Sequence, residues 1–234
     1  MIESLFFPSS NLLAASGMFY AFSMSTLAGR MVILLLALTS IVSWSVMFTK
    51  FSQVRAAERS GENFLHALRA ESQFAEIFRR GLTWQSCPLY ELYLAGCRGI
   101  QGSTDMDDAT KIILLESALE RAVAEQVVRL ESQISILGTV VSAAPFIGLL
   151  GTVWGVMDAF TGIALAGNAN IGALAPGIAA ALITTVVGLI VALPSMVGYN
   201  ILVANIRRLT MEMENFASEF LSIARRELLV AENV

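Results

Sequence analysis

Long uncharged stretches limit the possible folds of this chain more than any other feature. Residues 31–49, 132–157 and 159–206 are uncharged, whereas residues 50–131 hold 22 of the 34 charged side chains and residues 207–234 hold 9. The 19 residues of the first run reach about 28 Å as a helix, which matches a bilayer hydrocarbon core. At 56% hydrophobic residues, disorder is excluded, and the uneven charge excludes a soluble enzyme with a uniformly polar surface. The pattern predicts an all-α membrane protein with three transmembrane helices.

The uncharged runs and their borders divide the chain into seven segments. We expect an interfacial lead-in at 1–30, transmembrane helices at 31–49, 132–157 and 174–206, a cytoplasmic helical domain at 50–131, a periplasmic loop at 158–173 and a cytoplasmic C-terminal helix at 207–234. The loop is rich in Gly and Asn, and Pro176 suits a first helical turn. The lead-in offers Phe6, Phe7, Phe19 and Tyr20 as candidate interfacial anchors.

The basic residues near the runs predict the orientation. Seven of them border the segments assigned to the cytoplasm: Lys50, Arg55, Arg59, Arg121, Arg129, Arg207 and Arg208. The other side offers only Arg30. By the positive-inside rule, the N-terminus is periplasmic and the C-terminus is cytoplasmic.

Apolar stripes predict that helices two and three extend into the cytoplasm. After helix three, one stripe has spacings of three and four residues and comprises Ile206, Leu209, Met213, Phe216, Phe220 and Ile223. Before helix two, a charged helix opens at Asp105, Asp107 and Asp108, where acids suit the helix dipole. We expect these stripes to pack mainly within one chain and partly between subunits.

Small and hydroxyl-bearing residues recur along helices two and three, and they allow two interpretations. The hydroxyl-bearing residues are Ser135, Thr139, Ser142, Thr152, Thr184 and Thr185, and the small ones include Gly148, Gly151, Gly155, Gly177 and Gly188. One interpretation is close helix packing, and the other is a polar lining that faces a cavity or another helix. Pro145 and Pro194 are expected to bend their helices.

Several functions lack the residues that they require. Between Ser132 and Ile206 the only ordinarily charged group is Asp158, near the outer end of helix two, so the chain supplies no proton carrier near the midplane. The spacing of Cys87 and Cys97 and the single His66 predict no metal site. A net charge of -4 gives no footprint for nucleic acid, and no motif indicates a catalytic site or a cofactor.

Two runs carry a resemblance to a known family. APFIGLLGTVWG at 144–155 and APGIAAALITTVVGLIVALP at 175–194, followed by Gly198-Tyr199-Asn200, resemble the TolQ/ExbB/MotA family of proton-driven inner-membrane motor subunits. The short lead-in and the stretch from Ser43-Trp44 to Phe64 look more like TolQ than ExbB.

The resemblance implies a homopentamer in which helices two and three surround a central lumen. A pair of helices from a single-span partner resembling TolR or ExbD would occupy the lumen and carry the proton on an aspartate. The proton gradient would thereby be coupled to a third protein, resembling TolA or TonB. The family's proton-path hydroxyls match Thr152 and Thr185, whereas Ser135, Thr139, Ser142 and Thr184 stay nearer the packing interpretation.

One position departs from the family pattern. The family commonly has a glutamate after Pro-Gly-Ile-Ala, where this chain has Ala180. This weakens a direct role of the subunit in binding a proton and leaves the partner's aspartate as carrier. The alternatives are an ExbB-type subunit for outer-membrane import and a non-conducting scaffold or sensor. A self-contained transporter fits least, because inverted repeats are missing.

Overall fold

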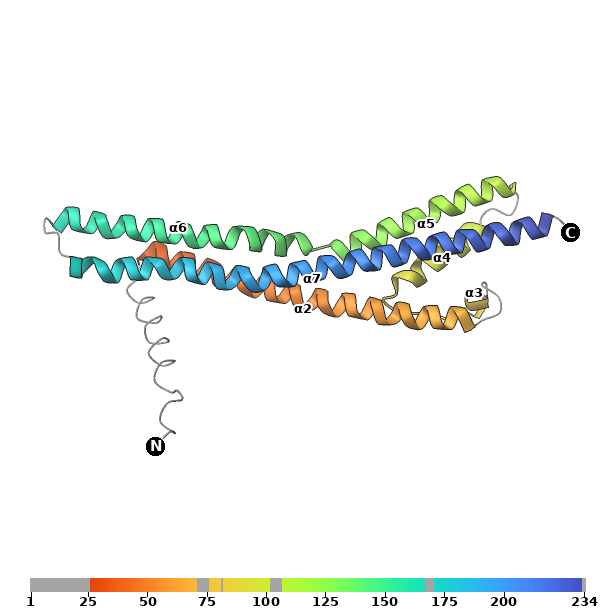
Figure 1. Cartoon of the computed structure of the whole chain (residues 1–234), viewed down its shortest axis with the longest axis horizontal. Coiled ribbons are helices and arrows are strands. Elements are labelled where there is room, and N and C mark those ends of the chain that lie inside the picture. Colours follow the sequence, from red (N-terminus) through yellow and green to blue (C-terminus); the bar gives the residue numbers. More distant parts are fainter. Residues whose placement is uncertain (1–25, 71–75, 81, 102–106, 167–170, 233–234) are drawn as a thin grey trace, which may run out of the picture. The chain divides into compact units, whose positions relative to one another are not determined.

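The computed structural model describes residues 26–70, 76–80, 82–101, 107–166 and 171–232. All regular elements in these ranges are α-helices (Figure 1). They are α2 (Leu27–Ala70), α3 (Glu76–Arg80), α4 (Pro88–Gln101), α5 (Asp108–Glu131), α6 (Ile134–Ala166) and α7 (Ile171–Glu232). The candidate anchors of the lead-in and residues 167–170 of the expected loop lie outside the described ranges.

Three stretches are long and apolar enough to cross a membrane: Leu27–Ala70, Asp108–Leu165 and Leu174–Arg226. They contain the three predicted spans. Most side chains of their apolar windows are not buried within the chain. Apolar surface of this kind is stable against lipid or against other helices, so the fold class predicted from the uncharged runs is confirmed for the single chain.

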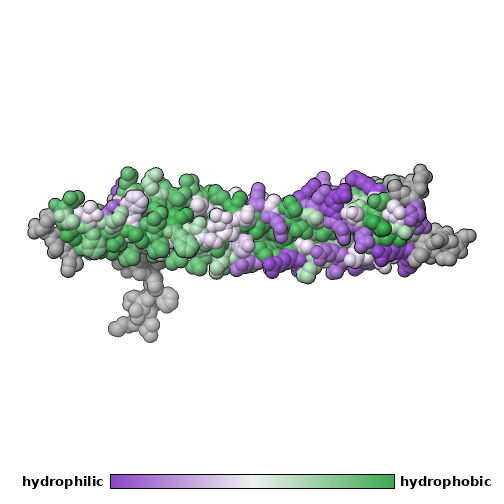
Figure 2. Space-filling view, turned by 90° about the horizontal axis from the view of Figure 1, so that it is seen from above, coloured by the Kyte–Doolittle hydropathy of each residue, from purple (hydrophilic) through white to green (hydrophobic). Residues whose placement is uncertain are grey.

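The chain divides into two compact units. The membrane unit comprises Met1–Met47 and Ile136–Tyr199, and the polar unit comprises Phe48–Ser135 and Asn200–Val234. Among the described residues of the membrane unit, only Arg30 and Asp158 are charged. Hydrophobic side chains accordingly dominate the surface of the membrane unit, and hydrophilic ones gather on the polar unit (Figure 2).

The polar unit has a core of aromatic side chains. Phe64 of α2 is fully buried, and its ring lies 5.3 Å from Trp84, 5.6 Å from Tyr93 and 6.0 Å from Phe216, measured between centroids. Such edge-on and tilted contacts add to the stabilisation from apolar burial. The stripe predicted after helix three supplies part of this core, because Leu209, Met213, Phe216 and Phe220 are all buried. Packing of that stripe within one chain is therefore confirmed.

Helix α5 begins and ends at well-defined caps. The Asp107 carboxylate accepts a hydrogen bond from the Thr110 amide at 3.2 Å, which satisfies one free donor at the N-terminus. At the other end, Gln133 has a φ of 66°, a left-handed conformation that is uncommon outside glycine. The expected cytoplasmic extension of helix two is therefore a separate helix, α5, interrupted at Ser132 and Gln133. By contrast, α7 continues unbroken past Ile206, as predicted.

The expected loop at 158–173 is shorter in the structure. Helix α6 continues through Asp158 to Ala166, and α7 begins at Ile171 rather than near Leu174. Asp is only a moderately poor helix former, so a single Asp between apolar residues does not end α6.

Candidate functional site

Helices α6 and α7 approach so closely in the membrane unit that several positions leave no room for a side chain. A methyl group placed on Gly148 would lie 2.7 Å from the Thr184 carbonyl oxygen, and one on Gly151 would lie 2.5 Å from Thr184 Oγ1. Gly155 meets Ala181 and Gly188 meets the Ala144 carbonyl, each at 2.7 Å. Small residues therefore determine the separation of these two helices, which is the usual means of packing helices in lipid.

Thr184 lies at the centre of this contact. Its side chain is fully buried, and Oγ1 lies 2.9 Å from the Gly148 carbonyl on α6 and 2.7 Å from the Ala181 carbonyl on its own helix. A hydroxyl has one proton to donate, so the two carbonyls share it. Thr184 thus joins the two backbones directly.

A second hydroxyl contact lies beside the first. Thr185 Oγ1 donates to Thr152 Oγ1 at 3.3 Å, and Thr152 Oγ1 donates to the Leu149 carbonyl at 2.7 Å. Thr152 is buried and Thr185 is half-buried. The three groups form a short directional chain from α7 to α6. Hydroxyls can pass hydrogen bonds along such a chain but cannot hold a charge at neutral pH.

Ala180 and Ala181 are both buried on α7, at 2% and 4% exposure. Gly177 is more loosely packed, because a methyl group there would meet Ala159 at an ordinary 3.4 Å. The alanine at 180 therefore presents no charged or hydrogen-bonding side chain at a buried position of the described α7.

The remaining hydroxyl candidates are more exposed than Thr152, Thr184 and Thr185. Ser135, Thr139 and Ser142 are exposed on α6, and Ser142 donates to the Gly138 carbonyl of its own helix at 3.0 Å. Pro145 and Pro194 both lie inside helices. The assignments of all these residues to packing, lining or bending stay predictions.

Two buried polar contacts were not predicted from the sequence. In the membrane unit, Ser43 and Ser195 are buried and their hydroxyl oxygens lie 2.6 Å apart, which joins α2 to α7. A methyl group on Gly198 would collide with Met47, so this pair of helices also depends on a small residue. The sequence signal was the presence of single serines in apolar runs, which is weak because serines also bond to their own helix.

In the polar unit, Lys50 is 2% exposed and holds the end of α5. Its Nζ donates to the carbonyls of Arg129 and Leu130 at 3.3 and 3.2 Å and to Ser132 Oγ at 2.9 Å. These carbonyls lie at the negative end of the helix dipole, where a cation is favourable. Burial lowers the pKa of Lys50 because desolvation disfavours the charged form.

Titratable side chains are scarce among the described residues around the contact between α6 and α7. Among the described residues of the membrane unit the one acid is Asp158, half-buried near the end of α6. Within those parts of the chain that the structure describes, no three His, Cys, Asp or Glu side chains come together as metal ligands. The described part of the contact between α6 and α7 offers hydroxyls and closely packed backbone but no carboxylate.

Comparison with known proteins identifies relatives along most of the chain. Residues 69–215 match the model of the MotA/TolQ/ExbB proton channel family. The Tol-Pal system protein TolQ of Pseudomonas aeruginosa is 28% identical over 226 residues, covering 93% of this chain and 96% of the relative. TolQ of Haemophilus influenzae is 29% identical and covers 88% and 92%. The biopolymer transport protein ExbB of Salmonella typhimurium is 32% identical and covers 82% and 80%.

Proposed function

Because this chain belongs to the MotA/TolQ/ExbB proton channel family, we propose that it is the channel-forming subunit of a Tol-Pal type motor driven by the proton gradient. Proteins of this family are non-enzymatic transport subunits of the inner membrane. The observation that carries the proposal is the Thr185–Thr152 hydroxyl pair, which lies in a membrane unit without a carboxylate at depth.

The proposed assembly is a homopentamer around a lumen lined by α6 and α7. A single-span partner resembling TolR or ExbD lies in the lumen and brings the aspartate that carries the proton. The small share of the apolar helix windows that is buried within the single chain supports contact of these helices with further subunits or with lipid. The distribution of Lys and Arg supports a periplasmic N-terminus and a cytoplasmic C-terminus.

The motor's output is proposed to be work on a TolA-like protein for envelope integrity and cell division. Coverage of 96% and 92% of the two TolQ relatives supports this branch. An ExbB-type role, energising import through a TonB-like protein, is the second candidate, and the higher identity of the Salmonella ExbB favours it. Co-purification separates the two, because the single-span partner recovered with the chain should come from a Tol or an Exb system.

The assembly is tested by native mass spectrometry of the full chain in detergent, purified with its co-expressed single-span partner. We expect five copies with the partner bound. A stable monomer without affinity for such a partner would contradict the proposal.

The pathway is tested in cells that depend on this gene. Thr185→Val removes the hydroxyl with little change of shape, so we expect loss of energy-dependent activity with intact assembly. Thr161→Val is the matched control, because the exposed Thr161 hydroxyl bonds only to the Met157 carbonyl of its own helix at 2.9 Å. Unchanged activity of Thr185→Val would favour a non-conducting scaffold.

A further inference from the structure

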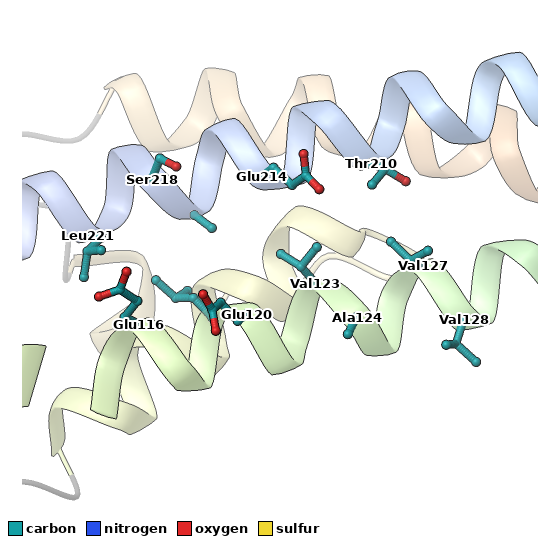
Figure 3. Close-up of a pocket in the computed structure, with 12 residues that line it drawn as sticks. Glu116, Glu120, Val123, Ala124, Val127, Val128, Thr210, Glu214, Ser218 and Leu221 are labelled. Carbon is teal, nitrogen blue, oxygen red and sulfur yellow. The ribbon is translucent and has the colours of Figure 1, made fainter. Parts of the chain in front are cut away.

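A groove in the polar unit lies between α5 and α7 and carries an apolar floor with an acidic rim (Figure 3). Its volume is about 630 Å³. The α5 wall consists of Glu116, Leu119, Glu120, Val123, Ala124, Val127 and Val128, and the α7 wall of Thr210, Glu214, Ala217, Ser218 and Leu221. Both sets recur at three- and four-residue steps, so each helix presents one continuous face to the groove.

The floor of the groove is apolar and open to solvent. Leu119 is buried at its base, whereas Val123, Val127, Ala217 and Leu221 are half-buried beside it. Val128 extends the apolar surface, with 68% of its side chain exposed. Apolar surface left open between two helices in a polar unit favours a further apolar occupant.

The rim of the groove is acidic, and its negative charge is not neutralised by basic side chains that line the groove. Its three charged residues are Glu116, Glu120 and Glu214, and no basic residue lines it. Glu116 is paired with Arg225 at 3.5 Å across one end. In the described parts of the chain, Glu120 and Glu214 form no ion pair, and they lie on opposite walls. The charge therefore selects a cationic occupant and disfavours an anionic lipid or a nucleic acid.

The length of the groove suits a short helix. From Glu116 to Val128 the α5 wall rises about 18 Å, which is a little over three helical turns. An amphipathic helix laid along such a groove places apolar side chains at steps of three and four residues on the floor. Basic residues that flank this apolar face would then reach the glutamates on both walls.

Groove-to-groove contact between two copies matches this surface less well, because it would oppose like charges. The α2 face of another copy is also a poorer match. The arginines of α2, Arg55, Arg59 and Arg69, are exposed and have the right sign, but between residues 49 and 70 no large apolar side chain is exposed to fill the floor. A surface that fits the groove must combine basic residues with large exposed apolar side chains.

We propose that this groove binds a basic amphipathic helix of about three to four turns from a partner protein. The inference rests on the groove itself and is independent of proton conduction. Its occupant is defined by its chemistry: an apolar stripe for the α5–α7 floor and Lys or Arg on both sides of that stripe.

The test uses the full chain in an uncharged detergent and a labelled peptide of about 14 Leu and Lys residues with the leucines on one helical face. A peptide of the same composition in scrambled order is the control. Fluorescence anisotropy should show saturable binding of the first peptide, weakened by salt, and at least tenfold weaker binding of the second. Equal binding of the two peptides, or none of either, would overturn the proposal.

Variants locate the binding to the groove. Glu120→Gln combined with Glu214→Gln should weaken binding about tenfold, because two charge contacts are lost. Glu125→Gln combined with Glu219→Gln is the matched control, since both residues are exposed on the same helices but do not line the groove. If the control pair weakens binding as much as the groove pair, the peptide binds elsewhere and the proposal is wrong.

A photo-crosslinking residue at Ala124, on the exposed edge of the groove, distinguishes the occupants. The proposal expects a crosslink to the peptide, reduced by unlabelled peptide. A crosslink from position 124 to a second copy that excess peptide does not reduce would show that the chain covers its own groove.

Discussion

The two units of this chain achieve stable helix packing in opposite ways. In the membrane unit, α6 and α7 pack closely because Gly148, Gly151 and Gly188 have no side chain to keep them apart. The polar unit relies on large side chains, with Phe64 and Tyr93 fully buried among other rings. In water, burial of apolar surface drives helices together, whereas lipid is as apolar as the side chains, so contact must come from close approach and hydrogen bonds. Helices α2 and α7 each have one part in the membrane unit and one part in the polar unit, so each takes part in both kinds of packing.

The largest effect is expected from removing an aromatic ring of the polar unit. Phe64→Ala should lower the free energy of unfolding by about 3–5 kcal/mol, because it removes a buried ring and leaves a cavity. Phe146→Ala in the membrane unit is the control, since Phe146 is 71% exposed and should cost little in detergent. Thermal unfolding followed by circular dichroism measures both. Equal shifts of the unfolding temperature in the two variants would contradict the difference between the two units.

Adding a large side chain in place of a glycine should disrupt helix packing in the membrane unit. Gly151→Leu places a branched side chain against Thr184, and overpacking of this kind costs about 1–3 kcal/mol or more. We expect loss of a monodisperse assembly in size-exclusion chromatography. Gly162→Leu is the matched control on the same helix, because a methyl group at Gly162 meets nothing within 4 Å. A normal yield of the Gly151 variant would refute the packing argument.

Lys50 tests whether a single buried cation stabilises the junction at the end of α5. Lys50→Met keeps much of the side-chain volume but leaves the Arg129 and Leu130 carbonyls without this donor. Loss of such partners costs about 1–3 kcal/mol. Hydrogen exchange should increase at the amides of residues 128–134. Unchanged exchange there would mean that water replaces the ammonium group at no cost.

The smallest effect is expected from the hydroxyl contact between α2 and α7. Ser43→Ala removes the bond to Ser195, and interhelical hydrogen bonds in membranes contribute about 0.6 kcal/mol on average. The free energy of unfolding in detergent should fall by no more than this amount. A loss as large as that of Phe64→Ala would show that polar bonds, rather than close packing, hold the membrane unit.

The sequence allowed prediction of the features that follow from charge and periodicity. The three spans, the continuity of α7 and the buried stripe from Leu209 to Phe220 all depend on patterns longer than ten residues. Local events were not predictable. Gln133 adopts a positive φ without being glycine, and Lys50 becomes buried because the end of α5 lies beside it, which no linear pattern reveals.

The candidate site was predictable as a set of residues but not as a geometry. Thr152, Thr184 and Thr185 were among the hydroxyl residues noted on helices two and three, yet spacing along each helix does not say which hydroxyl faces which carbonyl. In the structure Thr184 joins α7 to the α6 backbone, whereas Thr185 bonds to Thr152. Helix rotation within the pair decides this, and it depends on the glycines of both helices at once.

The central claim is that this subunit supplies hydroxyls to a proton pathway while a partner supplies the carboxylate. Proton uptake into liposomes, reported by an internal pH dye under an imposed potential, tests it with the chain alone and with its co-purified single-span partner. The account predicts flux only when the partner is present, and loss of that flux in Thr185→Val. Steady flux through the chain alone, at the rate of the complex, would contradict it.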